Sequence, residues 1–466
     1  MSARAVVVAA PASGSGKTTV ATGLMAALRR RGTAVAPFKV GPDYIDPGYH
    51  TLAAGRPGRN LDPVLVGADR IAPLARHGGA GAEIAVVEGV MGLFDGRIPD
   101  GAGSTAEVAG LLGAPVLLVV DCRGQARSLA ALLHGFRSFD PAPRSVGGAG
   151  IDRARIAGVV LNRVGSARHE EVLRAAADEA GLPVLGALPR RDALEVPSRH
   201  LGLVTAAEHG GAATAAVDAM AELVAAHVDL DAVLGLAAPL PAGPAWSPAD
   251  AVHERGTRGV ETSDSPPGSG GVVAVLGGPA FTFGYAEHVE LLAAAGAEPV
   301  TVDPLRDTAL PPGTGGLVLP GGFPEEHVAG LAANAPLLAA VRELAASGAP
   351  VHAECGGLLY LCGTLDGTRM CGVLPAEATR AERLTLGYRD AVALTDSALH
   401  PAGARVTGHE FHHWSVTPRA GAAAAWGWRG AGPEGFVTGG VHASFLHTHP
   451  AGDAAAVTRF VRRITG

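Results

Sequence analysis

Residues 351–358, VHAECGGL, have the composition of a short strand that ends in a nucleophilic turn. The glycines after Cys355 permit a strained backbone and bring the N–H of Gly356 close to a developing oxyanion. A helix that starts near Leu358 favours the thiolate at its N-terminus. These residue types, in this order, predict a cysteine nucleophile. The alternative is a buried structural cysteine at a strand end.

Histidines and a second glycine turn accompany this cysteine in the same half of the chain. Residues 440–449, GVHASFLHTH, read as a strand end that carries His442, His447 and His449, and residues 320–324 read PGGFP. Alternation along a strand puts His447 and His449 on one side and His442 on the other. A histidine that reaches Cys355 would supply the base that a thiol nucleophile needs.

A phosphate-binding loop is predicted at the other end of the chain. Residues 10–19, APASGSGKTT, lie between an apolar run and a helical pattern that extends through Leu28. In this order of strand, loop and helix, backbone N–H groups cradle phosphates, Lys17 adds positive charge, and the Thr18 hydroxyl can bind Mg²⁺. The predicted nucleotide contacts are Gly14, Ser15, Gly16, Lys17, Thr18 and Thr19. Because the usual first glycine is absent, the loop resembles the longer variant of dethiobiotin synthetase-like enzymes.

Acidic residues follow two further strand patterns in this half, where open parallel sheets bind their ligands. Glu88 ends one strand, and Asp43 and Asp46 follow another in a Gly/Pro-rich loop. Since Mg²⁺ takes oxygen ligands, Thr18, Asp43 and Glu88 are the expected metal contacts. Contacts to substrate or phosphate are expected from Lys39, Asp46, Asp95 and Ser104. Solvated loop acids, a surface lysine and an ordinary helix cap are the alternatives.

Composition narrows the class of protein. The chain has 466 residues with 47% hydrophobic and 4% aromatic content, and a formal net charge of −7. This length allows two or three domains, and the negative charge argues against a nucleic-acid partner. The four cysteines lack paired zinc spacing, and neither a signal peptide nor an apolar span long enough to cross a membrane is recognised. We expect a cytoplasmic protein without membrane contact; the oligomeric state stays open, a homodimer included.

The elements that must position these residues form two α/β domains. Continuous apolar runs at residues 34–38, 84–88, 115–121 and 156–162 alternate with helix-length stretches and predict a doubly wound parallel sheet. Runs at 272–276, 298–302, 316–319 and 350–353 repeat the scheme before several shorter strands. We therefore predict a P-loop domain over 1–235, a Pro/Gly/Ser-rich linker over 236–271 and a second domain over 272–466.

Together, six segments resemble the cobyrinate and hydrogenobyrinate a,c-diamide synthases, glutamine-dependent amidotransferases of cobalamin biosynthesis. They are FKVGPDYIDP from residue 38, NLD from 60, VEGVMGLFDG from 87, PGGFPE from 320, AECGG from 353 and GHEFH from 408. The resemblance covers nearly the whole chain. It implies a dethiobiotin synthetase-like ATP-binding domain followed by a class I glutamine amidotransferase-like domain.

The resemblance also implies a reaction and roles. ATP with Mg²⁺ would phosphorylate the a and c acetate carboxylates of a corrin, and ammonia from L-glutamine would displace phosphate from each acyl phosphate. Cys355 would attack the glutamine amide with His447 as its base, and Gly356 and Gly322 would hold the oxyanion. Asn162 would read the adenine edge, and arginines 190, 191 and 199 would clasp carboxylates of the corrin. An ammonia channel between the two halves is expected.

Some questions stay open at this stage. Class I amidotransferases place an orienting glutamate two residues after the catalytic histidine, where this chain has His449. Either a Cys–His dyad or an acid from elsewhere is therefore expected, and His442 and His449 can be purely structural. Cobyric acid synthase and nickel-sirohydrochlorin a,c-diamide synthase are the rival activities. A P-loop partition or regulatory protein would have no use for Cys355 with its histidine strand.

Overall fold

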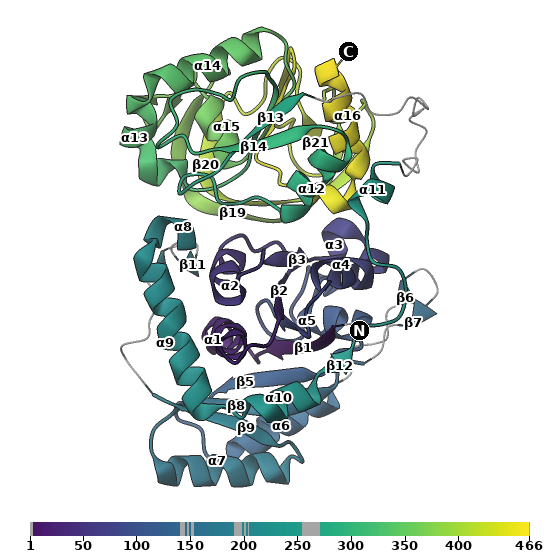
Figure 1. Cartoon of the computed structure of the whole chain (residues 1–466), viewed down its shortest axis with the longest axis vertical. Helices are drawn as coiled ribbons and strands as arrows, with labels where there is room; N and C mark the ends of the chain where they lie inside the picture. The colour runs from purple at the N-terminus through teal and green to yellow at the C-terminus, as the bar shows by residue number, and fades with distance from the viewer. Residues whose placement is uncertain are drawn as a thin grey trace. The chain divides into compact units, whose positions relative to one another are not determined.

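The computed structural model describes residues 3–139, 145–146, 149–150, 153–190, 198–199, 202–203, 205–253 and 271–465. The chain divides into two compact units, Met1–Trp246 and Ser247–Gly466. Each unit has its own parallel sheet, as Figure 1 shows. The predicted α/β class with a parallel sheet in each half is confirmed.

A parallel sheet with strand order β3-β2-β4-β1-β5-β8-β9 forms the centre of the N-terminal unit. Its strands are β1 (Arg4–Ala9), β2 (Val35–Val40), β3 (Arg59–Leu61), β4 (Ile84–Glu88), β5 (Val116–Asp121), β8 (Ile156–Val164) and β9 (Val184–Pro189). Every residue of β2 and β4 is buried. Because helices cover both faces, these strands are continuously apolar rather than alternating.

The helices of this unit follow the strands in sequence. They are α1 (Lys17–Arg30), α2 (Asp46–Ala54), α3 (Pro63–Val66), η1 (Ala68–Arg70), α4 (Ile71–Gly78), α5 (Thr105–Leu111), α6 (Ser128–Ser138), α7 (Ala167–Glu179), α8 (Ala206–His209), α9 (Gly211–His227) and α10 (Leu230–Leu236). The long helix α9 packs along α1 and α2 (Figure 1). A Cβ at Gly23 of α1 would lie 2.5 Å from the backbone oxygen of Met220, so this glycine allows the close approach of α1 to α9. Short strand pairs complete the unit: β6 (Ser145–Val146) with β7 (Ala149–Gly150), and β10 (Ser198–Arg199) with β11 (Gly202–Leu203).

The first part of the expected linker over 236–271 carries regular structure. Strand β12 (Ala238–Pro239) pairs antiparallel with Arg4 and Ala5 of β1, and the Trp246 ring lies edge-on to His77 at 5.0 Å. Helix α11 (Pro248–Ala251) then packs against the C-terminal unit's α12. A short extended segment held by backbone pairing has no apolar period, so sequence patterns do not reveal it. The Ser/Pro-rich stretch 262–269 lies outside the described residues.

Six strands in the order β14-β13-β15-β16-β23-β22 form the main sheet of the C-terminal unit. They are β13 (Val272–Leu276), β14 (Glu298–Val302), β15 (Thr314–Leu319), β16 (Val351–Glu354), β22 (Phe436–Thr438) and β23 (Val441–Ser444). All pair in parallel except β22, which runs antiparallel to β23. The helices are α12 (Ala286–Ala294), η2 (Pro324–His327), α13 (Val328–Ala333), α14 (Ala335–Ala346), α15 (Gly356–Leu361), η3 (Pro450–Gly452) and α16 (Ala454–Thr465).

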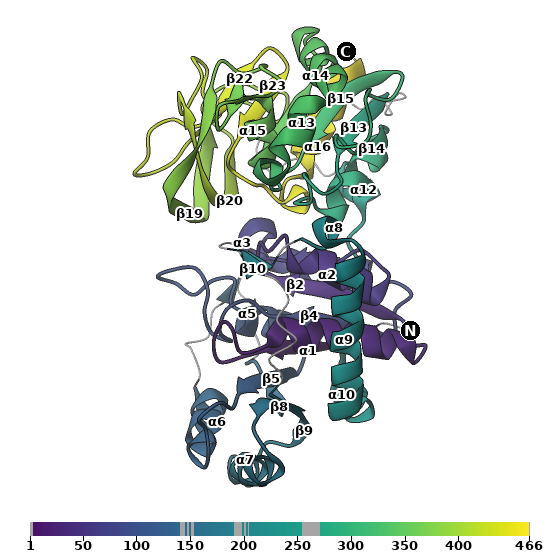
Figure 2. The ribbon, with the colours of Figure 1, turned by 90° about the vertical axis from the view of Figure 1, so that its left-hand side faces the viewer.

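A second sheet contains the two longest strands of this unit, β19 (Glu377–Ala393) and β20 (Arg405–Thr417). Strands β17 (Thr364–Leu365), β18 (Thr368–Arg369) and β21 (Trp426–Gly427) complete it. Figure 2 shows the β19–β20 hairpin standing beside the parallel sheet. The several shorter strands expected in this region are present, but the long strand β19 is not predicted, because it is largely exposed and carries charged residues that obscure a strand pattern. A backbone pair between His409 and His447 ties β20 to the segment after β23.

No single described helix is long and apolar enough to cross a membrane; one pair bent by 98°, Pro324–Ala333 with Ala335–Ala346, meets the length and composition criteria jointly.

Candidate active sites

The phosphate loop connects β1 to α1 as predicted from its residue order. Gly14 and Gly16 have φ values of 75° and 98°, a backbone region that glycine adopts without strain. The Lys17 ammonium donates to the backbone oxygen of Met91 at 2.5 Å. Burial, assisted by the charge of Lys39, lowers the pKa of Lys17 to about 8. The loop therefore presents a cation that is weakly solvated before any ligand binds.

A buried cluster of charged side chains adjoins the start of α1. Lys39 Nζ lies 2.5 Å from Asp46 Oδ2 and 2.9 Å from Glu88 Oε1. The Thr18 hydroxyl donates to Glu88 Oε1 at 2.7 Å. His50 Nε2 lies 2.6 Å from the other oxygen of Glu88. The ends of β2 and β4, adjacent in the sheet, thus bring a lysine, two carboxylates and the loop hydroxyl together.

Burial alone would neutralise these carboxylates. For Glu88, Lys39 and His50 outweigh that effect and hold its pKa well below the usual range. For Asp46, burial and the neighbouring Asp43 raise the pKa. The Lys39 ammonium, which we expected to face a ligand, contacts protein carboxylates instead. Lys39 therefore holds Glu88 and Asp46 in place.

Other predicted contacts of this unit lie around the loop in separate roles. Asp43 Oδ1 accepts from the backbone N–H groups of Ile45 and Asp46 at 2.9 and 3.1 Å. Asp95 accepts from Gly92 N at 2.8 Å, in a turn that hydrogen-bonds to the phosphate loop through Leu93 N and Ala10 O. Ser104 caps α5 by accepting from Glu107 N at 3.2 Å.

Asn162, expected at the adenine edge, contacts the phosphate loop itself. Its side-chain amide donates to the backbone oxygen of Ser15 at 2.9 Å from the end of β8. The neighbouring Arg163 donates to Gly14 O at 2.9 Å and to Asp121 at 2.6 Å. In this structure, therefore, Asn162 and Arg163 brace the loop. Arg190 lies at the end of the described segment 153–190, Arg199 is described only in its backbone strand, and Arg191 lies outside the described residues.

Cys355 occupies the turn between β16 and α15 in the C-terminal unit. Its φ of 49° and ψ of −103° are unusual for a residue with a side chain, and strain of this kind marks nucleophile turns. Its backbone N–H donates to Ser444 O at 2.8 Å, which joins it to the end of the adjacent strand β23. A Cβ at Gly357 would lie 2.2 Å from Leu319 O, so only glycine lets α15 start this close to β15.

The predicted glycine turn and histidine lie at the same end of this sheet. A Cβ added to Gly356 would lie 2.9 Å from Gly322 N. One added to Gly321 would lie 2.5 Å from Cε1 of His447. His447 is fully enclosed, and its Nδ1 is 3.8 Å from Glu354 Oε2. The structure thus brings Gly322, Gly356 and His447 to the Cys355 turn.

The electrostatics at this turn favour a neutral thiol. Burial, followed by the carboxylate of Glu325, raises the pKa of Cys355 above its usual range. The backbone N–H of Gly356, at the start of α15, favours the thiolate as expected, but burial and Glu325 outweigh it. Burial also lowers the pKa of His447 to about 4. At neutral pH the thiol of Cys355 and the imidazole of His447 are therefore both uncharged, and the imidazole can accept the proton of the thiol.

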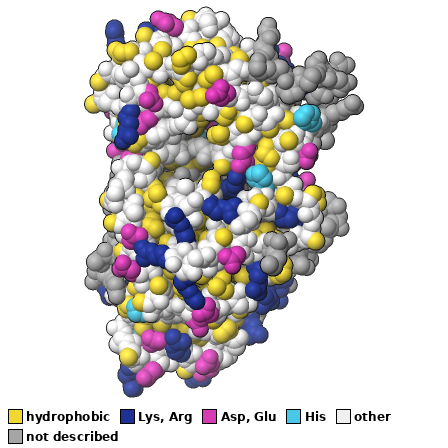
Figure 3. Space-filling view, viewed as in Figure 1, with side chains coloured by type: hydrophobic (Ala, Val, Ile, Leu, Met, Phe, Trp, Pro, Cys, Tyr) yellow, Lys and Arg dark blue, Asp and Glu magenta, His cyan; other side chains and the backbone are white. Residues whose placement is uncertain are grey.

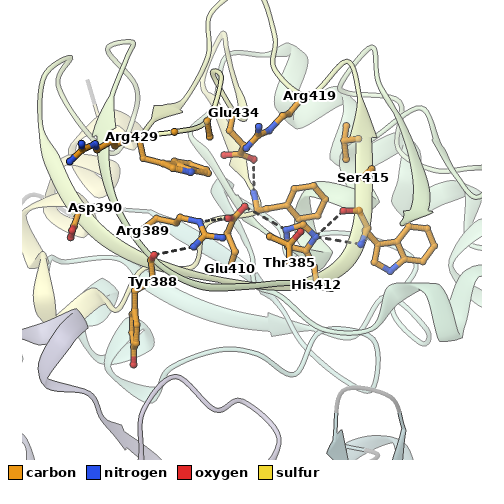
Figure 4. A pocket seen from close by; sticks show the side chains of 16 residues that line it. Thr385, Tyr388, Arg389, Asp390, Glu410, His412, Ser415, Arg419, Arg429 and Glu434 are labelled. Atoms are coloured by element: carbon orange, nitrogen blue, oxygen red, sulfur yellow. Dashed lines mark hydrogen bonds and ion pairs between the residues drawn. The ribbon is translucent and has the colours of Figure 1, made fainter. Parts of the chain in front are cut away.

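A pocket of about 800 Å³ lies on the concave side of the β19–β20 hairpin. Figure 4 shows Arg389 reaching Glu410, with Arg419 and Glu434 above them in this view. Arg389 Nε donates to Glu410 Oε2 at 2.6 Å. Glu410 and Phe445 connect the pocket to the cysteine: Glu410 contributes to the raised pKa of Cys355, and Phe445 shares its core cluster. The pocket therefore shares residues with the surroundings of the nucleophile and offers both signs of charge.

Comparisons with known proteins cover both units. The family model described as CobQ/CobB/MinD/ParA nucleotide binding domain matches residues 6–204. The one described as CobB/CobQ-like glutamine amidotransferase domain matches residues 272–455. A hydrogenobyrinate a,c-diamide synthase of Mycobacterium tuberculosis is 59% identical over 99% of this chain and 98% of its own length. The chain belongs to the hydrogenobyrinate and cobyrinate a,c-diamide synthase family.

Two further relatives show how names divide within the a,c-diamide synthase family. A Streptomyces coelicolor protein named hydrogenobyrinate a,c-diamide synthase is 56% identical over 98% of this chain and 97% of its own length. A Syntrophotalea carbinolica protein named cobyrinate a,c-diamide synthase is 40% identical over 99% of this chain and 98% of its own length. The relatives named for the metal-free ring share more residues with this chain.

Three residues that contact the predicted sites have no role in the sequence prediction. Glu354, directly before the nucleophile, and Glu410, within the GHEFH segment, are predicted only as parts of motifs. His50, which contacts Glu88, was not singled out. Two features of the sequence could have identified them. His50 follows the predicted loop acids Asp43 and Asp46 closely, and Glu354 directly precedes the predicted nucleophile.

Two observations concern metals and surface charge. Among the described residues, no group of three or more His, Cys, Asp or Glu is arranged to hold a metal ion through protein ligands alone. On the face of the N-terminal unit drawn in Figure 3, Lys and Arg side chains are interspersed with Asp and Glu. Such a mixed pattern is typical of a solvated protein surface.

Proposed function

We propose that this chain converts the a and c acetate carboxylates of hydrogenobyrinic acid to amides, using ATP and L-glutamine. The observation that carries the proposal is the full-length identity of 59% to a protein named for this activity. Relatives named for the cobalt-containing substrate are 39–41% identical, which favours the metal-free ring. We place this reaction in the cytoplasm.

The N-terminal unit would activate the carboxylate. A carboxylate is a poor acylating agent, whereas an acyl phosphate has a good leaving group. Gly14–Thr19 would cradle the nucleotide phosphates, with Lys17 stabilising the charge on the transferred phosphoryl group. The carboxylate oxygen attacks the γ-phosphorus, the bond to the β-phosphate oxygen breaks, and ADP leaves. Asp95 and Ser104 would border the bound carboxylate, and Asn162 would keep the loop in its binding conformation.

The donor set at the end of the loop suits Mg²⁺, which takes oxygen ligands and shares them with nucleotide phosphates and water. Thr18 Oγ1 and Glu88 Oε1 are 2.7 Å apart, and Asp43 lies in the adjacent loop. These three residues would hold the ion, which supplies charge neutralisation when bound. Lys39 and His50 would orient the carboxylate of Glu88 toward it.

The C-terminal unit would release ammonia from glutamine. The Cys355 thiol transfers its proton to His447 as sulfur bonds to the amide carbon, and the displaced electron pair moves to oxygen. Backbone N–H groups of Gly356 and Gly322 would hold that oxyanion. When the tetrahedral centre collapses, the carbon–nitrogen bond breaks and His447 returns the proton to the departing ammonia. Water then hydrolyses the thioester to glutamate.

Recognition of glutamine would fall to the pocket beside the hairpin. The amino acid carries a carboxylate and an ammonium at one end, and the Arg389–Glu410 pair offers a partner for each. A guanidinium binds a carboxylate through two parallel hydrogen bonds, which fixes the ligand's orientation. This arrangement would leave the side-chain amide to extend toward Cys355.

Mass spectrometry of the products tests the proposal. Incubation with ATP, Mg²⁺ and glutamine is run in parallel with hydrogenobyrinic acid and with cobyrinic acid. Each conversion of a carboxyl to an amide lowers the mass by about one unit, and two conversions of the metal-free ring are expected. Cys355→Ser should abolish the use of glutamine while sparing amidation at high ammonium concentration. No amidation of either ring, with glutamine hydrolysis intact, would contradict the proposed substrate.

A further inference from the structure

The position where class I amidotransferases keep an orienting glutamate is occupied here by His449, and the structure gives His449 another task. Its ring lies 4.1 Å from that of Tyr285, and its Nδ1 accepts from Ala451 N at 3.2 Å. His449 thereby caps η3. The acid that would orient His447 must come from elsewhere in the fold.

Glu354, on the strand that carries the nucleophile, is held beside His447. Its Oε1 accepts from both the backbone N–H and the hydroxyl of Thr448, at 3.0 and 2.9 Å. His352 Nε2 lies 3.3 Å from the same oxygen. The other oxygen, Oε2, is 3.8 Å from Nδ1 of His447. Three contacts thus fix one carboxylate oxygen, and the second faces the histidine.

The path of the chain explains this arrangement. Strands β16 and β23 pair in parallel with Glu354 opposite Ser444, so the residues that follow each strand meet at one end of the sheet. Alternation places His352 and Glu354 on the same face of β16. The other edge of the His447 ring, with Cε1 and Nε2, borders Gly321. The imidazole therefore has one nitrogen toward Glu354 and the other toward the glycine turn.

The charge states of Glu354 and His447 support the same assignment. Although burial opposes it, the hydrogen bond and charge of His352 lower the pKa of Glu354 to about 2, so Glu354 is a carboxylate at neutral pH. His447 is also faced by His352 of β16 and by Glu410 and His412 of β20. Burial makes the protonated imidazole costly, and a carboxylate within 4 Å offsets that cost where water cannot. The carboxylate of Glu354 lies against Nδ1 of His447.

We propose that Glu354 is the positioning residue of the glutaminase site: it holds His447 in the tautomer with hydrogen on Nδ1 and stabilises the imidazolium formed when Cys355 attacks. The triad is then Cys355, His447 and Glu354, with an acid that precedes the nucleophile instead of following the histidine. This inference rests on the proposed glutamine hydrolysis. The 3.8 Å separation is expected to shorten once substrate is bound, as hydrogen bonds at catalytic sites commonly do.

Glu354→Gln is the decisive variant. Glutamine at this position keeps the acceptor for Thr448 but turns an amide N–H toward Nδ1, which favours the wrong tautomer of His447. We expect kcat for glutamine hydrolysis to fall by about 10²–10⁴-fold with little change in KM for glutamine. Ammonium-dependent amidation should be unchanged. Glu354→Asp, which keeps the acid, should recover part of the lost kcat.

Controls separate this inference from a structural effect and from the proposed function. Glu343→Gln removes an exposed glutamate of α14 and should leave kcat unchanged. If Glu354→Gln fails to fold, Thr448→Val tests the same contact, because it removes one donor to Glu354 and should lower kcat without raising KM. A kcat for Glu354→Gln within about threefold of wild type overturns the inference while the proposed function stands. Glutamine hydrolysis that survives Cys355→Ser would overturn the proposed function itself.

Discussion

Glu434 shows how a single buried acid makes stability depend on pH. It accepts from Phe445 N at 2.9 Å and from the Ser444 hydroxyl at 2.7 Å. Burial nevertheless raises its pKa from 4.5 to about 7. The folded state therefore binds this proton more tightly than the unfolded state. Below pH 4.5, the usual pKa of a glutamate, this proton contributes its full stabilisation of the fold. The free energy of unfolding falls as the pH rises from 4.5 to about 7, and it stays at the lower value above that.

Glu434→Gln should remove that pH dependence. Relative to the variant, the wild type is expected to lose on the order of 3 kcal/mol of unfolding free energy between pH 4.5 and pH 7.5. Denaturant unfolding of both proteins across this range, followed by a signal from the C-terminal unit, measures the difference. A constant difference between the two proteins would show that the acid does not change its protonation on unfolding.

Replacing Lys39 should lower the unfolding free energy of the N-terminal unit substantially. It is 3% exposed and lies between Asp46 and Glu88. Lys39→Met keeps a similar length but leaves two buried carboxylates without their cation, a change that typically costs about 3–5 kcal/mol. Arg30→Met, which breaks the exposed ion pair with Asp218, is the matched control and should cost under about 1 kcal/mol. Equal losses of unfolding free energy in the two variants would contradict this account.

Two helical glycines, Gly23 of α1 and Gly135 of α6, lie in opposite surroundings: one is tightly packed and the other is open. Gly23→Ala in α1 would place a methyl group 2.5 Å from Met220 O of α9 and 2.6 Å from a methyl of Val224. Such overpacking is expected to destabilise by about 1–3 kcal/mol. Gly135 in α6 has open space around its Cβ position, so Gly135→Ala should stabilise by about 0.5–1 kcal/mol. Thermal unfolding of the two variants should move in opposite directions, and a shift in the same direction would contradict the packing of α1 on α9.

The elements also show where sequence reasoning succeeds and fails. Strands such as β4 were predictable because parallel strands buried on both faces are unbroken apolar runs. Strand β19 was not, because a mostly exposed strand has no such run. The Cys355 turn followed from its glycines. The contact of Glu354 with His447 depends on the pairing of β16 with β23, and pairing between distant segments leaves no local pattern.

For the whole molecule, the proposed division of labour predicts that each activity can be lost separately. Lys17→Ala removes the cation of the phosphate loop and should lower amidation at least about 100-fold with glutamine or with ammonium. Glutamate release by the other unit should persist. Cys355→Ser should abolish glutamate release and glutamine-dependent amidation, and it should spare amidation with ammonium. Product formation from both nitrogen sources, with glutamate release measured alongside, checks both variants, and an equal loss of glutamate release in Lys17→Ala would contradict the division.

Neighbours in the main sheet of the C-terminal unit, β16 and β23, are separated along the chain by the whole β19–β20 hairpin. The hairpin is thus an insertion between two strands that pair directly, and its length does not alter their register. Under the proposed roles, the strand ends carry the cysteine and histidine, whereas the hairpin carries Arg389 and Glu410. Hairpin side chains that line the pocket can therefore change and alter ligand choice without changing the pairing of the two strands, provided that the backbone pair between His409 and His447 is kept.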